Sequence, residues 1–572
     1  MNQPKPIYLS VLSALLAALV SSGCASPLKI SELLLFDRDR SLRQRNADVP
    51  PNSPERPAIL FLAFDGLDRS LIYDMLRKGE LPNLAELLGG QGEKGQFPHA
   101  YFDEELLSTM PSSTLAAWST VITGRTPAEH GVAGNEFFIR EERRLAAPAP
   151  VSFRDSAPTL EVYTDDYVNK IIQVPTIYER MRDHDPNVLI WVAVHQAYRG
   201  ADRLLVAPPI VLAEAFQDLF EETLKKGLNP NKPSRDIYEK LDHNVVSEVT
   251  SALGKGPLPD VLTIYMTGTD LYAHIAEEGP NDARRKYMVE VIEPSMGDLL
   301  KKLRERNGLA NRYVVLTSDH GHTPVLYDEE HAMSAKGGSG VVPDLMKKAG
   351  YRVRPFRLNV SPNDDFDAVL AEGGATAYVY VANRATCPNP HDVCDWREPP
   401  RYEEDVLPMA EAFFKNNQDG SLAPSIKGNL DLILTRRPKP FAEVDLPFKV
   451  YIGGGKTMPV DEYLASHPHP TYVATETRLR DLAVGLHGER AGDVMLIAHN
   501  GDRPDKEDRF YFASLYRSWH GSPSRQDSEI PFIVANPALS SAALKARVDK
   551  ILGPEPRQQK VGEVLLELRE AK

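Results

Sequence analysis

Short apolar segments alternate with amphipathic segments along most of this chain. The apolar segments are rich in β-branched residues and end at polar or turn-forming residues, a pattern typical of strands buried on both faces of a sheet. We predict seven such strands: Ala58–Phe64, Val188–Val194, Val261–Met266, Tyr313–Thr317, Tyr378–Ala382, Val494–Ala498 and Pro531–Ala535. Helical patterns lie between them, for example at Leu67–Leu88 and Asp282–Arg306. The alternation predicts an α/β fold with a mostly parallel central sheet flanked by helices.

The regular alternation is interrupted between residues 325 and 480, where Gly, Pro and polar segments replace it. We interpret residues 325–480 as an insertion or cap. The first part of the core would then be residues 57–324, and its C-terminal part residues 481–572. No internal repeat is visible, and the pattern carries no signal for an oligomeric state.

The N-terminal segment has the pattern of an export signal. Lys5 precedes the apolar stretch Ile7–Val20, and small residues follow it. This order is typical of a secretory signal, and the stretch is shorter than the ~20 residues that span a bilayer. A weakly hydrophobic N-terminal helix is the alternative.

The small residues directly before Cys24 resemble a bacterial lipoprotein signal, although Ser21 stands where that motif prefers Leu. The resemblance implies a signal peptide at residues 1–23, cleavage before Cys24, lipid on its thiol and a tether at residues 24–56. We therefore expect a periplasmic or membrane-anchored lipoprotein of a bacterial cell envelope, with the lipid as its membrane contact.

Composition narrows the class of protein. The 572 residues are 42% apolar and 26% charged, which excludes collagen-like, coiled-coil and wholly disordered chains. The net charge of −14 argues against a nucleic-acid-binding surface. After Cys24, only Cys387 and Cys394 remain. In an oxidising compartment a local disulfide is the simplest expectation for them, and zinc binding is less expected because their spacing is not C-x-x-C.

Acidic residues follow three of the predicted strands. Asp65 follows Ala58–Phe64, Asp270 lies just beyond Val261–Met266, and Asp319 follows Tyr313–Thr317. In open α/β sheets, sites form outside the carboxyl ends of strands. A single such Asp is usually a helix cap or turn residue, so only the set favours a metal site.

Histidines strengthen this interpretation. His274 follows Asp270 by four residues, so a helix starting there would present both from one face. His320 is adjacent to Asp319, and His520 is a further candidate that precedes a glycine. Carboxylate and imidazole ligands suit Zn²⁺, with Mn²⁺ or Fe as alternatives.

A hydroxyl-rich segment, Thr109–Gly124, has the pattern of a helix start and stop. An ordinary Ser/Thr cap is the plain interpretation. The same geometry would place a hydroxyl such as that of Thr114 where free N–H groups and the helix dipole favour a phosphate.

These segments together resemble the alkaline phosphatase superfamily, particularly its nucleotide pyrophosphatase/phosphodiesterase branch. The matching segments occur in the family's order: Phe64-Asp65-Gly66, Thr114–Gly124 with its continuation to Asn135, Asp270-x-x-x-His274, Ser318–Gly321 and His520-Gly521. The resemblance implies an alkaline-phosphatase-like core and a hydrolase acting on phosphoric ester bonds of small molecules.

The resemblance also implies the site residues. One zinc ion would be held by Asp65, Asp319, His320 and the Thr114 oxygen. A second zinc ion would be held by Asp270, His274 and His520. Thr114 would be the nucleophile that forms a covalent phospho-threonine, and Asn135 would bind a phosphate oxygen. His322 has no role in the family's pattern, so we expect it to be structural or to support the ligands.

Substrate and activity have alternatives. Superfamily monoesterases often add a Lys and an Arg near the phosphate; here the comparable positions are Ala197 and Arg199. Arg199 is thus a possible phosphate contact or a surface residue, and the missing lysine favours a diester or pyrophosphate over a monoester. Thr114-Leu115-Ala116 does not fit the sulfatase nucleophile motif. A non-catalytic surface lipoprotein on this fold is a further alternative, which the complete ligand set disfavours.

Overall fold

The computed structural model describes residues 57–149, 167–205, 235–333, 340–355, 360–437 and 447–570. The predicted signal peptide, the predicted tether and the predicted lipidation site at Cys24 lie outside these residues. None of the helices in the described part of the chain is long and apolar enough to cross a membrane.

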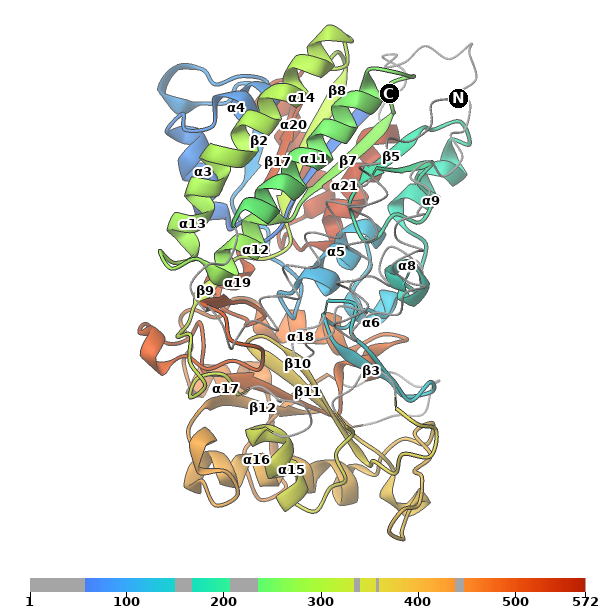
Figure 1. The fold of residues 1–572 in the computed structure, drawn as a ribbon, viewed down its shortest axis with the longest axis vertical. Coiled ribbons are helices and arrows are strands. Elements are labelled where there is room, and N and C mark those ends of the chain that lie inside the picture. The colour runs from blue at the N-terminus through green and yellow to red at the C-terminus, as the bar shows by residue number, and fades with distance from the viewer. Residues whose placement is uncertain are drawn as a thin grey trace, which may run out of the picture.

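The central sheet has seven strands in the order β2-β17-β8-β1-β7-β5-β6 and occupies the upper half of Figure 1. All its neighbouring pairs are parallel except those of β17, which runs antiparallel to both β8 and β2. The predicted α/β class with a mostly parallel sheet is therefore confirmed. The bounds are β1 Ala58–Phe64, β2 Ala100–Asp103, β5 Ile190–Ala193, β6 Arg203–Leu205, β7 Val261–Met266, β8 Arg312–Ser318 and β17 Phe532–Ala535.

Strand register aligns the ends of three neighbouring strands. Phe64, the last residue of β1, is the partner of Met266 in β7 and of Ser318 in β8. Every residue of these three strands is buried. Because the strands are parallel and in step, the segments that follow them leave the sheet at one edge.

Helices cover both faces of this sheet. Figure 1 shows α11 and α14 in front of the sheet and α20 and α21 behind it. The predicted helix at Leu67–Leu88 is two helices, because the chain turns at Gly79 (φ 74°) and restarts at Pro82. The described core helices are α3 Arg69–Arg77, α4 Pro82–Leu87, α5 Thr114–Thr123, α6 Pro127–His130, α8 Tyr167–Ile171, α9 Ile177–His184, α11 Arg235–Leu253, α12 Gly268–Ile275, α13 Pro280–Tyr287, α14 Glu293–Glu305, α19 Arg525–Ser528, α20 Ser541–Leu552 and α21 Gln559–Glu570.

A second sheet of six antiparallel strands, in the order β10-β11-β15-β12-β13-β14, forms the lower half of Figure 1. Apolar residues of α15 and α16 pack on it and form a second core. Its elements are β10 Ala368–Gly373, β11 Thr376–Val381, β12 Leu430–Thr435, β13 Lys449–Tyr451, β14 Thr457–Pro459, β15 Val494–Ala498, α15 Val341–Lys348, α16 Leu407–Asp419, α17 Val460–Ser466 and α18 Thr475–Ala483.

The second sheet extends beyond the edge predicted for the insertion at residue 480. The segment Val494–Ala498, expected in the C-terminal part of the core, pairs as β15 with β11 and β12 instead of joining the central sheet. A five-residue apolar run fits the middle of either sheet, so its pattern does not reveal its partners.

Two short ribbons and a disulfide complete the described structure. The ribbons are β3 Phe137–Ile139 with β4 Arg144–Ala146, and β9 Thr323–Pro324 with β16 Ser518–Trp519. Cys387 and Cys394 are joined by a disulfide, with their Cα atoms 4.7 Å apart. The structure thus contains the local pairing that the short spacing predicts.

Candidate metal centre and active site

The level strand ends place three carboxylates close together. Asp65 lies in the turn after β1 and Asp319 in the turn after β8. Asp270 lies in the first turn of α12, which begins two residues after β7. All three side chains are buried. The strand-end cluster that the sequence predicts is therefore present as geometry.

One donor group consists of Asp65, Asp319, His320 and Thr114. The Nε2 atom of His320 lies 3.2 Å from Asp319 Oδ2, 3.6 Å from Asp65 Oδ1 and 3.2 Å from Thr114 Oγ1. Two ligands of one tetrahedral zinc ion are about 3.3 Å apart, given Zn–N and Zn–O bonds near 2.1 Å. The two carboxylate oxygens are buried and have no hydrogen-bond partner within the described part of the chain. These residues therefore fit a bound cation.

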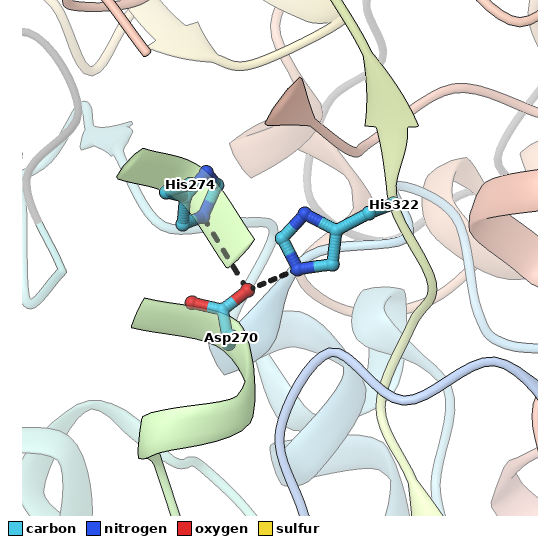
Figure 2. Close-up of side chains that lie close together, drawn as sticks. All are labelled: Asp270, His274 and His322. Carbon is cyan, nitrogen blue, oxygen red and sulfur yellow. Dashed lines mark ion pairs between the residues drawn. The ribbon is translucent and has the colours of Figure 1, made fainter. Parts of the chain in front are cut away.

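A second donor group is centred on Asp270. Its Oδ1 atom lies 3.3 Å from His274 Nε2 and 4.0 Å from His520 Nε2. The same oxygen lies 2.8 Å from Nε2 of His322, and Figure 2 shows the rings of His274 and His322 directed at it. The structure thus brings all seven predicted ligand residues close together, and the side chain of His322 lies beside them.

Backbone carbonyls fix the tautomers of the three predicted histidine ligands. A carbonyl oxygen only accepts, so a ring nitrogen bonded to it carries a proton, and in the neutral ring the other nitrogen keeps a lone pair. Each Nδ1 donates to a carbonyl: His274 to Ser518 (2.7 Å), His320 to Gly321 (3.0 Å) and His520 to Ser112 (2.9 Å). The Nε2 lone pairs are therefore available to a metal, as is usual for orienting partners of this kind.

The electrostatics of the three carboxyls also favour a cation. Burial, together with the charges of Asp319 and Asp270, holds the pKa of Asp65 well above its usual range. Burial raises the pKa of Asp319 to about 7. Burial alone would raise the pKa of Asp270 too, but the charge of His274 outweighs it and the pKa is lowered. A divalent cation would let all three carboxylates ionise together.

The predicted nucleophile is the first residue of α5. Ser113 occupies the N-cap position without a side-chain hydrogen bond to any described residue, and Gly124 ends the helix with φ 66°, as the sequence predicts. The backbone N–H of Leu115, next to Thr114, donates to Asn135 Oδ1 at 3.0 Å. This bond fixes the Asn135 amide, and its Nδ2 makes no hydrogen bond to the residues that the structure describes. Nδ2 is therefore placed beside Thr114 as a potential donor.

Arg199 does not join this cluster. Its Nε donates to Glu179, its Nη1 donates to the carbonyls of Asn169 and Ile172, and its Nη2 donates to the carbonyl of Val174. Every nitrogen of the guanidinium already has an acceptor in this structure, so a phosphate would have to displace one of them.

Several supporting residues were not predicted. The Tyr265 hydroxyl donates to Asp65 Oδ2. Ser518 bonds to two rings, through its carbonyl to His274 and through its hydroxyl to His322 at 3.1 Å. A tyrosine inside a strand and a serine in a short two-residue strand are common in any sequence, so their pattern carries no functional signal.

A further group of potential ligands, Asp431, His499 and Asp502, lies on the second sheet. It is satisfied internally: Tyr472 donates to Asp431 at 2.6 Å, His499 pairs with Asp502 at 2.7 Å, and Arg503 donates to His499 Nε2 at 2.8 Å. An arginine in contact with the ring disfavours a cation there.

Comparison with known proteins assigns this chain to a family. Residues 59–412, more than half of the chain, match the family described as type I phosphodiesterase / nucleotide pyrophosphatase. The chain belongs to this family, a branch of the alkaline phosphatase superfamily. The predicted resemblance is confirmed.

Two curated relatives are distant in sequence. A protein of Myroides odoratus named calcium-transporting ATPase is 22% identical over 346 residues, which cover 47% of this chain and 62% of that protein. A Schizosaccharomyces pombe protein described as an uncharacterized pyrophosphatase/phosphodiesterase is 23% identical over 273 residues, covering 46% of this chain and 45% of that protein. The chain thus spans less than two thirds of either relative.

Solved structures cover more of the chain. Murine ectonucleotide pyrophosphatase/phosphodiesterase 5 covers 90% of it, with 95% of that chain covered, at 12% identity and a TM-score of 0.46. Phosphonoacetate hydrolase from Sinorhizobium meliloti, solved with phosphonoacetate, covers 91% of it, with 96% of that chain covered, at 15% identity and the same TM-score.

Proposed function

We propose that this protein hydrolyses phosphodiester or pyrophosphate bonds of small molecules, using two zinc ions and a covalent phospho-threonine on Thr114. The observation that carries the proposal is the donor group of Asp65, Asp319, His320 and Thr114 at the start of α5. Its spacing fits one cation, and it sets the candidate nucleophile beside that cation.

The chain's own residues account for positioning in the proposed reaction. Bound divalent cations would lower the pKa of the Thr114 hydroxyl and neutralise negative charge on the phosphate and the leaving oxygen. The start of α5 presents its positive dipole end to the phosphate. The Asn135 amide, fixed by Leu115, donates from Nδ2 to a non-bridging oxygen.

Bonds and protons balance in two steps. The Thr114 hydroxyl gives its proton to water, and its Oγ1 atom forms a bond to phosphorus while the bond to the leaving oxygen breaks. The leaving oxygen takes a proton from water. A water molecule then attacks phosphorus on the side opposite the Thr114 oxygen, the bond from phosphorus to that oxygen breaks, and the Thr114 oxygen takes up the proton that the attacking water loses. Two in-line displacements of this kind require no further protein acid or base.

The preference for a diester rests on the residues around Arg199. Ala197 stands where the monoesterase pattern has lysine, and the Arg199 guanidinium is held by Glu179 and backbone carbonyls. Both facts support a substrate with a less charged phosphate. A phosphate monoesterase is the second candidate, because Arg199 stands at the arginine position of the monoesterase pattern. The pattern at residues 1–24 supports export and lipid anchoring in a bacterial cell envelope as part of the proposal.

Thr114→Ala tests the proposal. We expect this variant to lose at least about 10³-fold in kcat on an aryl phosphodiester while keeping nearly all its bound metal, because removing a nucleophile costs that much or more. Ser119→Ala is the matched control, since that hydroxyl lies on the same helix and has no hydrogen-bond partner within the described residues.

Activity and metal content are measured together on aryl diester, monoester and sulfate, before and after chelation. Wild-type-like turnover by Thr114→Ala would contradict the covalent mechanism. A wild-type protein with no tightly bound divalent metal and no turnover on any ester would favour the non-catalytic alternative.

A further inference from the structure

We infer that His322 is a fourth protein ligand of the ion held by Asp270, His274 and His520. The inference rests on the proposed metal-dependent function and adds a ligand that the family's pattern does not contain. His322 lies just before β9, two residues beyond His320, and its side chain is fully buried.

The first observation is the distance. His322 Nε2 lies 2.8 Å from Asp270 Oδ1, the oxygen that is 3.3 Å from His274 Nε2 (Figure 2). Ligands of one ion with bonds near 2.1 Å stand about 2.9 to 3.4 Å apart in octahedral and tetrahedral geometry. His322 thus approaches the carboxylate about as closely as an accepted ligand pair would.

The second observation is the position of the ring proton. The hydroxyl of Ser518 donates to the carbonyl of Ala273 at 2.8 Å, so its oxygen is left to accept. His322 Nδ1 lies 3.1 Å from that oxygen and therefore donates to it. The proton of the neutral ring is on Nδ1, and Nε2 carries a lone pair.

The third observation is an unsatisfied pair of acceptors. Within the described part of the chain, neither His322 Nε2 nor Asp270 Oδ1 has a partner in hydrogen-bond geometry, although the two atoms are 2.8 Å apart. Two buried lone pairs facing each other without a donor are costly, and a shared cation removes the cost.

The fourth observation is the space kept open beside them. Gly66 adopts φ 64°, and a Cβ atom there would lie 2.6 Å from His322 Nε2 and 2.9 Å from Asp270 Oδ1. Any side chain at residue 66 would therefore enter the space between the two donors. The same glycine donates its N–H to Asp319 Oδ1 at 3.0 Å, so it borders both donor groups.

A structural role is the competing explanation. His322 could merely orient Asp270, as outer hydrogen-bond partners of metal ligands do. That role requires an N–H directed at the carboxylate, whereas the proton of this ring is directed at Ser518. With His322 included, three imidazoles and one carboxylate would hold the ion, which suits zinc better than magnesium or calcium.

The test measures metal binding instead of turnover. We expect the purified wild-type chain to hold two zinc ions. In competition with a chelator, the more weakly bound of the two should bind at least 100-fold less tightly to His322→Ala than to the wild type. Cobalt substitution should show a changed visible spectrum in the same variant. His331→Ala is the control, because that ring pairs with Asp328 outside both donor groups.

Ser518→Ala and His322→Gln refine the result. Ser518→Ala removes the hydrogen-bond partner of Nδ1, which should weaken binding of the ion about 10- to 100-fold, as for other outer partners of metal ligands. His322→Gln retains a polar atom but is a poor ligand, so wild-type affinity in this variant would favour the structural role and overturn the inference.

If His322→Ala does not fold, a crystal structure of the wild-type protein with zinc tests the same inference. We expect anomalous density within about 2.1 Å of His322 Nε2. A zinc ion bound by Asp270 and His274 but far from that nitrogen would overturn the inference while leaving the proposed function intact. Absence of both metal and phosphoesterase activity would instead refute the proposed function itself.

Discussion

Each histidine of the candidate metal centre has its Nδ1 proton directed at an oxygen on the far side of its ring. Backbone carbonyls do this for His274, His320 and His520, and a serine hydroxyl does it for His322. Burial lowers the pKa of His320 to about 3, so that ring stays neutral at physiological pH. The lone pairs are thus directed before any cation arrives, which is the pre-organisation that a tight metal site needs.

Asn135 offers a sharp test at the residue scale. In Asn135→Asp the Oδ1 atom still accepts from the Leu115 N–H, but the amide donor becomes a carboxylate oxygen that repels phosphate. We expect kcat/KM on a phosphodiester to fall about 10²- to 10³-fold, the usual loss for one oxyanion donor, with metal content unchanged. If Asn135 served only to cap α5, activity would survive this substitution and fall only in Asn135→Ala.

At this scale the sequence singled out the clustered carboxylates, but not the residues that support them. Asp65, Asp270 and Asp319 could be selected because each follows a recognisable strand. His322 could not be identified as a ligand, because its partner Ser518 is 196 residues away and the pairing depends on the β9–β16 ribbon. Arg199 was predicted as a possible phosphate contact from a local motif, while its actual partners come from α8, α9 and the segment between them.

At the scale of elements, strand register is what assembles the site. Phe64 in step with Met266 and Ser318 makes the strand-end carboxylates neighbours. Apolar runs predicted these strands almost to the residue. The same runs did not assign β15 to the second sheet, because a strand's burial is visible in its own sequence and its pairing partners are not.

Arg478 links the segment predicted as an insertion to the loop before the proposed nucleophile Thr114. From α18 its buried guanidinium donates to the carbonyls of Ser108 and Thr109 and, at 2.7 Å, to the Ser112 hydroxyl. The carbonyl of Ser112 in turn accepts from His520. The loop before Thr114 therefore takes its shape from a residue 364 positions later in the chain.

Arg478→Met should loosen this loop. It leaves at least two buried acceptors without a donor, at about 1–3 kcal/mol each, so we expect a stability loss of about 2–4 kcal/mol in urea unfolding. We also expect kcat to fall about tenfold or more with KM little changed, because the reacting groups and not the binding contacts are displaced. Arg480→Met, an exposed arginine on the same helix, is the control and should change neither quantity. Loss of stability with unchanged kcat would limit Arg478 to a structural role.

For the whole molecule, the net charge of −14 does not describe the site. Three of its acids are buried together, and without a cation burial favours the neutral form of two of them. Metal binding would therefore be coupled to proton release, since a cation would displace the protons that burial holds on these carboxyls.

The coupling has a definite sign. Burial raises the pKa of Asp319 to about 7 and holds that of Asp65 well above its usual range, and Asp270 raises the pKa of His274 although burial lowers it. All three groups bind protons more tightly than usual, so zinc affinity should fall as the pH drops from 7 towards 5.5. The slope should be about tenfold per pH unit for each proton released. Calorimetry in two buffers of different ionisation enthalpy measures how many protons are released when zinc binds. We expect at least one at pH 6. Asp319→Asn removes one of the displaced protons, so its affinity should be weaker and its slope smaller. A zinc affinity that does not change with pH in this range would show that the carboxylates are already ionised in the metal-free protein.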